Sequence, residues 1–135
     1  MANALYGKGR NYFLSGSIDW INDTITAVLV DTGFPYTVSI DADEFLSDIP
    51  AGARIATQAM AGMSAALGVA DANDTVFSAV TGATVEAVVI YKDTGAAATS
   101  NLIAYIDTAT GLPVTPNGGN ITVQWDSGAN KIFKL

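Results

Sequence analysis

The sequence contains no cysteine and no histidine in its 135 residues. Without cysteine the chain has no disulfide, no thiolate metal site and no thiol nucleophile. Without histidine it lacks the side chain that most often acts as a general base or metal ligand near neutral pH. Acid–base catalysis would depend on carboxylates alone, so the sequence predicts a protein that is not an enzyme and that carries no cofactor and no metal.

Positive charge is also scarce. Six Lys and Arg stand against 13 Asp and Glu, which gives a formal net charge of −7 and a pI near 4.1. Nucleic acids and anionic membranes are bound through clusters of Lys and Arg, so we expect neither nucleic acid nor membrane as a partner. No apolar run reaches the length of a membrane span, and the first residues lack the apolar segment of a secretory signal. We therefore expect a protein that stays in an aqueous compartment.

Half of the residues are hydrophobic, 14% are charged and 13 are glycine, a composition typical of a folded chain rich in strands and turns. A chain of this length fits one domain and buries roughly two-thirds of the surface of its unfolded form. Three runs rich in β-branched and aromatic residues, 75–80, 84–91 and 102–107, predict consecutive strands. The middle run has Glu86 as its only charge and is predicted to be a central strand buried on most of both faces.

Alternating apolar residues predict further strands at 24–30, 36–40, 53–60, 121–125 and 131–135. Residues 3–14 are compatible with a short helix that Gly16 would end, and residues 41–50 with one capped helical turn. Residues 61–70 are small and predict a loop or a poorly specified strand. About eight or nine short strands with frequent turn signals predict an all-β fold, a single β-sandwich domain over 1–135 with a short N-terminal helix or arm at 1–15.

Two acidic stretches are candidate cation sites. Residues 71–75 begin like a calcium loop, but Val76 and Gly82 occupy the positions where that loop needs glycine and a carboxylate, so an acidic turn is the better interpretation. The densest group of carboxylates is Asp41, Asp43, Glu44 and Asp48. This group would suit calcium or magnesium, although capping of a helix N-terminus explains it more simply.

Two other motifs suggest chemistry. Glu86 could be one half of a glycosidase carboxylate pair, but nothing in the sequence supplies the second carboxylate. The stretch GKGR at 7–10 is reminiscent of a phosphate-binding loop, yet it lacks that loop's spacing, and Tyr12 stands where a dinucleotide-binding motif needs its third glycine. We interpret this stretch as a mobile basic N-terminal arm that can dock onto an acidic partner surface.

Exposed aromatic residues would be candidate binding residues, because aromatic side chains concentrate binding energy at interfaces. Trp20, Phe34 and Trp125 are candidate interface anchors, although Trp125 alternates in register with apolar neighbours and fits a core position better. A carbohydrate-binding module would need an exposed row of aromatic residues. Trp20, Phe34 and Tyr36 are the candidates for such a row, and they are few.

Four stretches, taken in their order, carry a resemblance to a known family: IDWINDTI at 18–25, DTG at 31–33 with YTV at 36–38, FLSDIP at 45–50, and LIAYIDTATGLPVTPNGGNITVQWDSGANKIFKL at 102–135. Together they are similar to the head decoration (cement) proteins of tailed bacteriophages. The resemblance implies a jelly-roll β-sandwich without catalytic residues that associates with itself, as a dimer rather than a trimer. It also implies synthesis in the bacterial host cytoplasm and a final place on the outer capsid surface of the virion, bound to the major capsid protein.

We expect the contacts with the major capsid protein at the terminal segments 1–10 and 131–135 and at the loops 92–101 and 111–119. The residues predicted at this protein interface are Leu5, Tyr6, Lys8, Arg10, Lys92, Asp93, Pro113, Pro116, Lys131, Phe133 and Lys134. Two alternatives stay open. One is a structural protein of the phage tail or adhesion apparatus, and the other is a carbohydrate-binding β-sandwich module.

Overall fold

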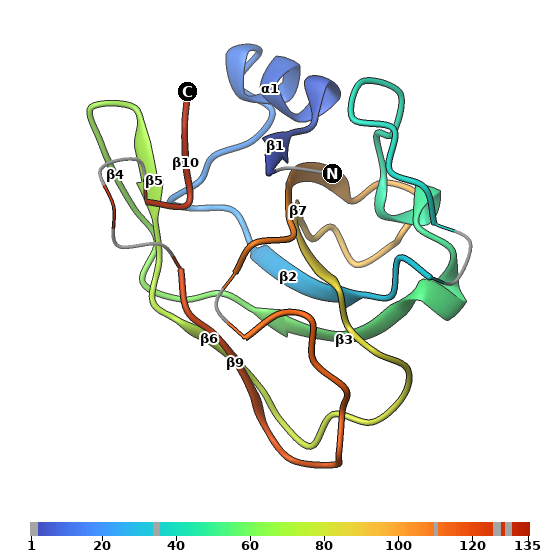
Figure 1. Cartoon of the computed structure of the whole chain (residues 1–135). Helices are drawn as coiled ribbons and strands as arrows, with labels where there is room; N and C mark the ends of the chain where they lie inside the picture. The colour runs from blue at the N-terminus through green and yellow to red at the C-terminus, as the bar shows by residue number, and fades with distance from the viewer. Residues whose placement is uncertain (1–2, 34–35, 110, 126–127, 129–130) are drawn as a thin grey trace.

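The computed structural model describes residues 3–33, 36–109, 111–125, 128 and 131–135. Antiparallel strands dominate it, and α1 (Gly7–Leu14) is the one α-helix among these residues (Figure 1). The strands are β1 (Ala4–Leu5), β2 (Ile25–Val30), β3 (Arg54–Ala59), β4 (Ser64–Ala66), β5 (Val69–Asp71), β6 (Thr75–Phe77), β7 (Ala87–Lys92), β8 (Asn101–Ile106), β9 (Ile121–Val123) and β10 (Phe133–Lys134). The predicted all-β sandwich with a short N-terminal helix is confirmed.

A five-stranded sheet in the order β1-β8-β7-β2-β3 forms the middle layer of the molecule. Two smaller sheets, β10-β5-β4 and β6-β9, pack against one of its faces. All these neighbours pair antiparallel. β7 lies at the centre of the large sheet and its residues 87–91 are all buried, so the prediction of a central buried strand is confirmed. The jelly-roll strand order stays a prediction.

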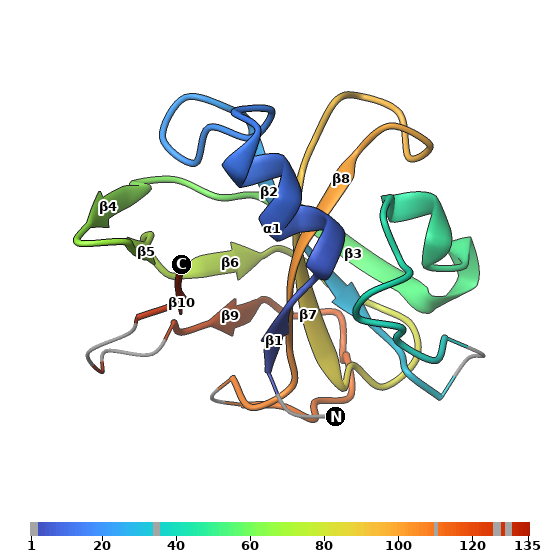
Figure 2. The same ribbon diagram turned by 90° about the horizontal axis from the view of Figure 1, so that it is seen from above.

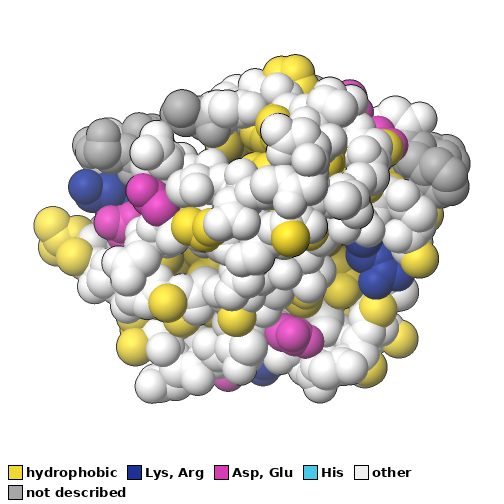
Figure 3. Space-filling view, turned by 90° about the horizontal axis from the view of Figure 1, so that it is seen from below, with side chains coloured by type: hydrophobic (Ala, Val, Ile, Leu, Met, Phe, Trp, Pro, Cys, Tyr) yellow, Lys and Arg dark blue, Asp and Glu magenta, His cyan; other side chains and the backbone are white. Residues whose placement is uncertain are grey.

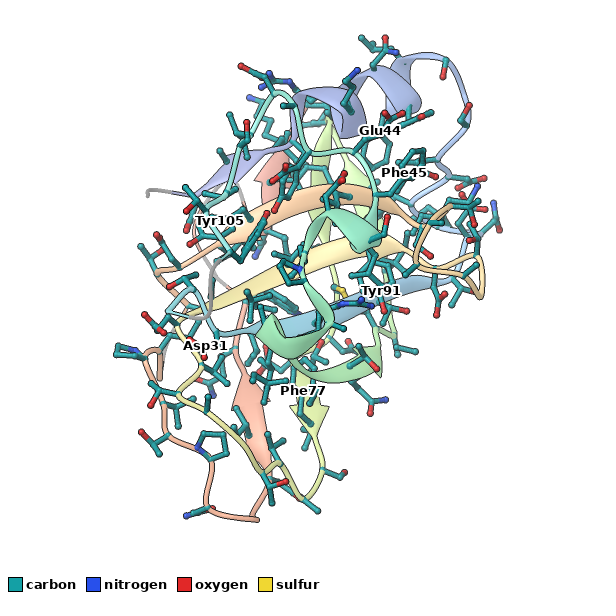
Figure 4. The ribbon with its side chains drawn as sticks, turned by 90° about the vertical axis from the view of Figure 1, so that its right-hand side faces the viewer. Asp31, Glu44, Phe45, Phe77, Tyr91 and Tyr105 are labelled. Atoms are coloured by element: carbon teal, nitrogen blue, oxygen red, sulfur yellow. The ribbon has the colours of Figure 1, made fainter. Side chains whose placement is uncertain are left out.

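The side chains of β7 alternate between two hydrophobic clusters, one on each face of the large sheet. Val88 and Ile90 belong to the cluster beneath the smaller sheets, which we call the small-sheet cluster. Val89 and Tyr91 belong to the cluster beneath segment 36–53, the side seen in Figure 4. This second cluster contains Tyr6, Tyr36, Tyr91 and Tyr105, and we call it the tyrosine cluster. Burial of both faces explains why β2, β7 and β8 are almost uninterrupted apolar runs.

Segment 36–53 differs from its prediction. Residues 36–40 form no strand, because backbone groups of this stretch bond outside any sheet: the Ile40 carbonyl accepts the N–H of Gly7 at 2.8 Å, and the Ser39 carbonyl accepts that of Asp43 at 2.9 Å. The predicted helical turn at 41–50 is confined to one short 3₁₀ turn, η1 (Leu46–Asp48), and a second 3₁₀ turn, η2 (Ala51–Ala53), follows after Pro50. Apolar side chains nevertheless hold this irregular segment on the sheet, with Ile49 fully buried.

Residues 61–70 contain most of a β-hairpin that the sequence left unspecified. β4 and β5 pair through three residues each, and Leu67 and Gly68 form the two-residue turn between them. Both turn residues have positive φ, 54° for Leu67 and 78° for Gly68. Two consecutive positive φ angles are the geometry of a tight type I′ hairpin turn.

The N-terminal segment is not a free arm, which corrects that prediction. β1 pairs with β8, and the side chain of Tyr6 is fully buried. α1 lies so close to β8 that a Cβ on Gly9 would stand 2.4 Å from the carbonyl oxygen of Leu102. Gly9 of the GKGR stretch therefore permits helix-to-sheet contact, and a Cβ on Gly7 would stand 2.6 Å from the Asp41 carboxylate, so both glycines have a packing reason in a pattern that looked like a phosphate loop or a mobile arm.

Candidate binding surface

The large apolar side chains that the described residues expose gather at one end of the molecule. They are Leu14, Ile21, Leu67, Val76 and Leu135, with exposed fractions of 85%, 49%, 97%, 43% and 56%. Ile21 and Leu135 line a groove of about 360 Å³, which we call the apolar groove, and Leu14 and Leu67 each adjoin a residue that lines it. Only Val76, on β6, lies outside this group. Such a concentration of exposed apolar surface makes this groove the candidate contact site of the molecule.

Three chain segments form the walls of the apolar groove. They are the end of α1 with the following loop, the β4–β5 hairpin, and the C-terminal residues around β10. Figures 1 and 2 show the C-terminal end between α1 and the hairpin. α1 ends where Gly16 adopts a φ of 78° and donates its N–H to the carbonyl of Phe13 at 3.2 Å, as predicted for a helix-ending glycine.

The loop after α1 turns Trp20 inward and Ile21 outward. The Asp19 carboxylate accepts the backbone N–H of Ile21 at 3.0 Å and that of Asn22 at 3.1 Å. The Asn22 side-chain amide, with these backbone donors, lowers the pKa of Asp19 from its usual range because it stabilises the ionised form. The loop is therefore fixed by its own hydrogen bonds, and Ile21 is held in an outward position.

Trp20 forms part of the floor of the apolar groove. It is 6% exposed, and its indole N–H is shared between the carbonyls of Ser64 at 3.1 Å and Asp71 at 3.2 Å, one from each strand of the hairpin. The Phe133 ring meets the Trp20 ring edge-on at 5.1 Å between centroids. Trp20 is thus a packed core residue that ties the loop to the hairpin, and not the exposed anchor that the sequence suggested.

Leu67 combines exposure with backbone strain. It stands at the hairpin tip with a φ of 54° and an exposed fraction of 97%. Asn, Asp or Gly is preferred at this position of such a turn, and the left-handed conformation costs a leucine about 1 kcal/mol. Neither the turn geometry nor packing within the chain accounts for a leucine here. Strain combined with exposure indicates a residue selected for contact with a partner.

The sequence did not identify Leu14, Ile21 or Leu67 as binding residues, and it included Leu135 only as part of the predicted contact segment 131–135. Residues 64–70 read SAALGVA, where Leu67 is the only large side chain among small ones and precedes a glycine. The Leu67–Gly68 pair was the sequence signal for an exposed leucine, because a two-residue hairpin turn places its first residue at an exposed tip. The other three depend on which way a loop or chain end faces, which only the fold decides.

The predicted interface residues do not form one surface. Leu5, Lys131, Phe133 and Lys134 line one hollow of about 620 Å³, while Pro113 and Pro116 belong to the segment between β8 and β9 and are not part of this lining. Lys92 instead contacts its own chain: its Nζ is 3.3 Å from the Asp23 carboxylate and donates to the Ser17 carbonyl at 2.8 Å. Asp93 likewise accepts the N–H of Gly95 at 2.8 Å, inside the predicted contact loop.

The remaining predicted interface residues lie at the N-terminal end. Lys8 is exposed on α1, and Arg10 is exposed with its guanidinium 4.0 Å from the Asp41 carboxylate. Tyr6 cannot reach a partner, which corrects its prediction, because its side chain is 0% exposed and its hydroxyl hydrogen-bonds the Tyr36 hydroxyl at 2.7 Å. Phe133, at 9% exposed, is mainly a core residue as well.

The carboxylates of the 41–48 group accept local hydrogen bonds. Asp43 accepts the Tyr36 hydroxyl at 3.0 Å and the N–H of Ser39 at 2.9 Å. Asp48 accepts the N–H of Glu44 at 2.8 Å and that of Phe45 at 2.9 Å. Within the described ranges, no group of three or more acidic side chains is placed to hold a metal ion. These contacts fit the capping interpretation, with turns in place of a regular helix.

Tyrosine hydroxyls connect segment 36–53 to the rest of the fold. Burial raises the pKa of Tyr6 and of Tyr36 far above the ordinary value, because the charged form would lose its hydration. Burial also raises the pKa of Tyr91 to about 12. A hydrogen bond to the Glu44 carboxylate raises the pKa of the Tyr12 hydroxyl on α1. These hydroxyls stay protonated near neutral pH, and those of Tyr12 and Tyr36 donate to carboxylates.

The other candidate positions also have structural roles. Glu86 accepts the Thr32 hydroxyl at 3.0 Å. In the 71–75 stretch, Asp74 accepts the backbone N–H of Trp125 at 3.1 Å and the Asn73 carbonyl accepts the Trp125 indole N–H at 3.0 Å, so this acidic turn holds a tryptophan. The face seen in Figure 3 carries few charges, and its hydrophobic side chains are dispersed.

No helix among the described residues is long and apolar enough to cross a membrane. No protein-family model matches the chain, and no curated protein sequence matches it either. The grounds for a functional proposal are therefore the apolar groove with its Leu67 tip and the sequence resemblance described above.

Proposed function

We propose that the protein is a head decoration protein of a tailed bacteriophage, which binds the outside of the major capsid protein lattice and stabilises the mature head. The observation that carries the proposal is the apolar groove, with the exposed Ile21 and Leu135 in its lining and the exposed Leu14 and Leu67 each next in sequence to a lining residue. A surface of this kind favours a binding protein over a free monomer. The resemblance of the sequence to decoration proteins supplies the identity of the partner.

The proposed mechanism is mechanical. A packed β-sandwich that contacts several capsid subunits gains from effective concentration, because individually weak contacts on one rigid body add into a durable clamp. Self-association, as a dimer, would multiply the contacts further. Binding to the expanded lattice alone would stabilise that state by mass action. The net charge of −7 keeps the protein away from the packaged DNA.

The exposure of the aromatic residues disfavours the carbohydrate-binding alternative. Trp20 and Tyr36 are 6% and 4% exposed, so neither can stack on a sugar ring, and Phe34 lies outside the described residues. A structural protein of the tail or adhesion apparatus would use the same kind of apolar surface. It differs from a decoration protein in copy number.

The first test is the copy number of this protein relative to the major capsid protein in purified virions, by quantitative mass spectrometry. A ratio near one is the expected result for a component that covers the shell. A ratio of a few per hundred would assign the protein to the tail or a vertex, and its absence from virions would reject the structural role.

The second test assigns the surface. Leu67→Asn removes the exposed leucine and installs a residue that suits the left-handed turn. We expect binding to capsids stripped of this protein to fall at least tenfold, because a central apolar anchor contributes about 2 kcal/mol or more to an interface. Val76→Thr is the matched control, since it makes an exposed apolar position outside the groove polar and keeps a strand-compatible side chain. Equal binding by both variants would exclude the groove as the contact surface.

A further inference from the structure

The hollow of about 620 Å³ that the two terminal segments share is a second surface feature, separate from the apolar groove. β1, the end of β8 and residues 131–134 form its walls. Its lining mixes polar and apolar groups, with the half-buried Leu5 and Ile132 among the apolar ones, and two positive side chains, Lys131 and Lys134, stand at the wall. The described lining contains no Asp or Glu, so we call it the cationic hollow.

Neither lysine makes an ion pair with another of the residues that the structure describes. Two of the six positive side chains make an ion pair within the described part of the chain, Arg10 with Asp41 and Lys92 with Asp23. Lys131 and Lys134 do not, although the chain carries 13 acidic residues. A local excess of positive charge in a protein of net charge −7 attracts an anionic group and repels a cationic one.

Lys131 is also held in an unfavourable backbone conformation. Its φ is 49°, in the left-handed region where glycine or asparagine is normally found. Its backbone N–H bonds the Gly128 carbonyl at 3.2 Å, which fixes this turn. A strained position occupied by a lysine, whose side chain contacts no partner among the described residues, suits a side chain that serves an external contact.

We propose that the cationic hollow binds an acidic peptide segment of a partner protein. Carboxylates of the segment meet Lys131 and Lys134, and its apolar side chains rest on the half-buried Leu5 and Ile132. A peptide fits better than a nucleic acid, because two lysines on a protein of net charge −7 are too few to hold a continuous line of phosphates. Phe133 lines both the hollow and the apolar groove, so one partner can occupy the two together.

The two tryptophans allow the hollow to be tested directly. Trp125 lines the cationic hollow and Trp20 lines the apolar groove, and each donates its indole N–H to a backbone carbonyl. The full chain, labelled with ¹⁵N, is titrated with a short synthetic peptide of alternating glutamate and leucine. We expect a saturable shift of the Trp125 indole signal and an unchanged Trp20 signal.

Charge variants establish the site. Lys131→Asn suits the positive φ and removes the charge, and Lys134→Gln removes the second charge. Each is expected to weaken peptide binding about fivefold, the size of one partly exposed ion pair. Lys8→Gln is the control, because Lys8 is exposed on α1 outside the hollow. The indole signals of each free variant show that its fold is intact.

Three results would overturn the proposal: equal binding of a peptide of alternating lysine and leucine, an equal loss with Lys8→Gln, or tighter binding of inorganic phosphate or an oligonucleotide. Equal binding of the lysine–leucine peptide would mean that apolar contacts alone hold the peptide. An equal loss with Lys8→Gln would mean that the overall charge of the protein, and not the hollow, attracts it. Tighter binding of phosphate or an oligonucleotide would mean that the hollow selects another class of anion. The titration is independent of the virion role. Peptide binding by a protein absent from virions would keep the hollow and reject the decoration proposal.

Discussion

The two faces of the five-stranded sheet are covered in different ways. On the face of the tyrosine cluster, an irregular segment is closed over the sheet by buried apolar side chains and by hydroxyls that find partners, such as Tyr36 between Tyr6 and Asp43. On the face of the small-sheet cluster, the packing continues outward to the apolar groove, where large side chains remain in water. The closed side therefore carries stability, and the open side has apolar surface left for binding.

The sharpest test of this contrast compares one residue type on the two sides. Ile49 is fully buried in the tyrosine cluster, whereas Ile21 is 49% exposed at the groove. Ile49→Ala is expected to lower the free energy of unfolding by about 2–5 kcal/mol, from lost burial and a cavity. Ile21→Ala is expected to lower it by no more than about 1 kcal/mol.

Urea denaturation of both isoleucine variants measures the difference. Capsid binding provides the reverse readout, since the folded Ile49→Ala protein should bind normally while Ile21→Ala should bind weakly. Similar losses of stability in the two variants would mean that the groove is part of the core, and the contrast would not hold.

Alkaline pH tests the closed side alone. Tyr91 has its pKa raised to about 12 in the folded state, against about 10 when unfolded, and burial raises the pKa of Tyr6 and Tyr36 as well. Between pH 10 and the raised folded values, the unfolded chain has lost protons that the folded chain retains. The stability due to these groups is therefore complete below pH 10 and declines as the pH rises above it.

Tyr91→Phe isolates one of these groups. The variant should lose less stability than the natural chain between pH 10 and 12, by about 1–2 kcal/mol, because one of the shifted hydroxyls is gone. Unfolding curves at pH 7, 10 and 11.5 give the measurement, and the two proteins should have similar stability at pH 7. Parallel declines in both proteins would show that Tyr91 does not titrate as its burial implies.

The sequence predicted best where one local pattern was sufficient. β7 was predicted as a central strand because the run 84–91 has Glu86 as its only charge, a composition that suits a strand buried on both faces. The prediction of a strand at 36–40 was wrong. Alternating apolar residues indicate that one side of a segment is buried, but they do not show whether its backbone pairs with a neighbouring strand. The segment that contains Tyr6, Gly7 and Gly9 was predicted to be a mobile arm. The structure shows that Gly9 allows α1 to lie close to β8, and in this arrangement Tyr6 is buried.

The candidate binding surface was largely hidden for a physical reason. Exposure of Leu14, Ile21 and Leu135 depends on how the loop after α1, the β4–β5 hairpin and the C-terminal residues pack together. A local sequence pattern does not determine that packing. The terminal lysines were predicted as interface residues from charge alone. The hollow that Lys131 and Lys134 line is formed with β1 and β8, which are distant in the sequence.

The smallest expected effect concerns Leu67, and its sign is the informative part. Leu67→Asn should raise the free energy of unfolding by about 0.5–1 kcal/mol, because asparagine accepts a φ of 54° more readily than leucine and the 97% exposed side chain has no packing to lose. Thermal or urea unfolding of the variant provides the value, with Val76→Thr as the control. A substitution that stabilises the fold and weakens binding to capsids would show that leucine is retained at the tip for contact, at the expense of stability. A loss of stability would instead mean that Leu67 packs within its own chain in solution, and the open side would then be closed as well.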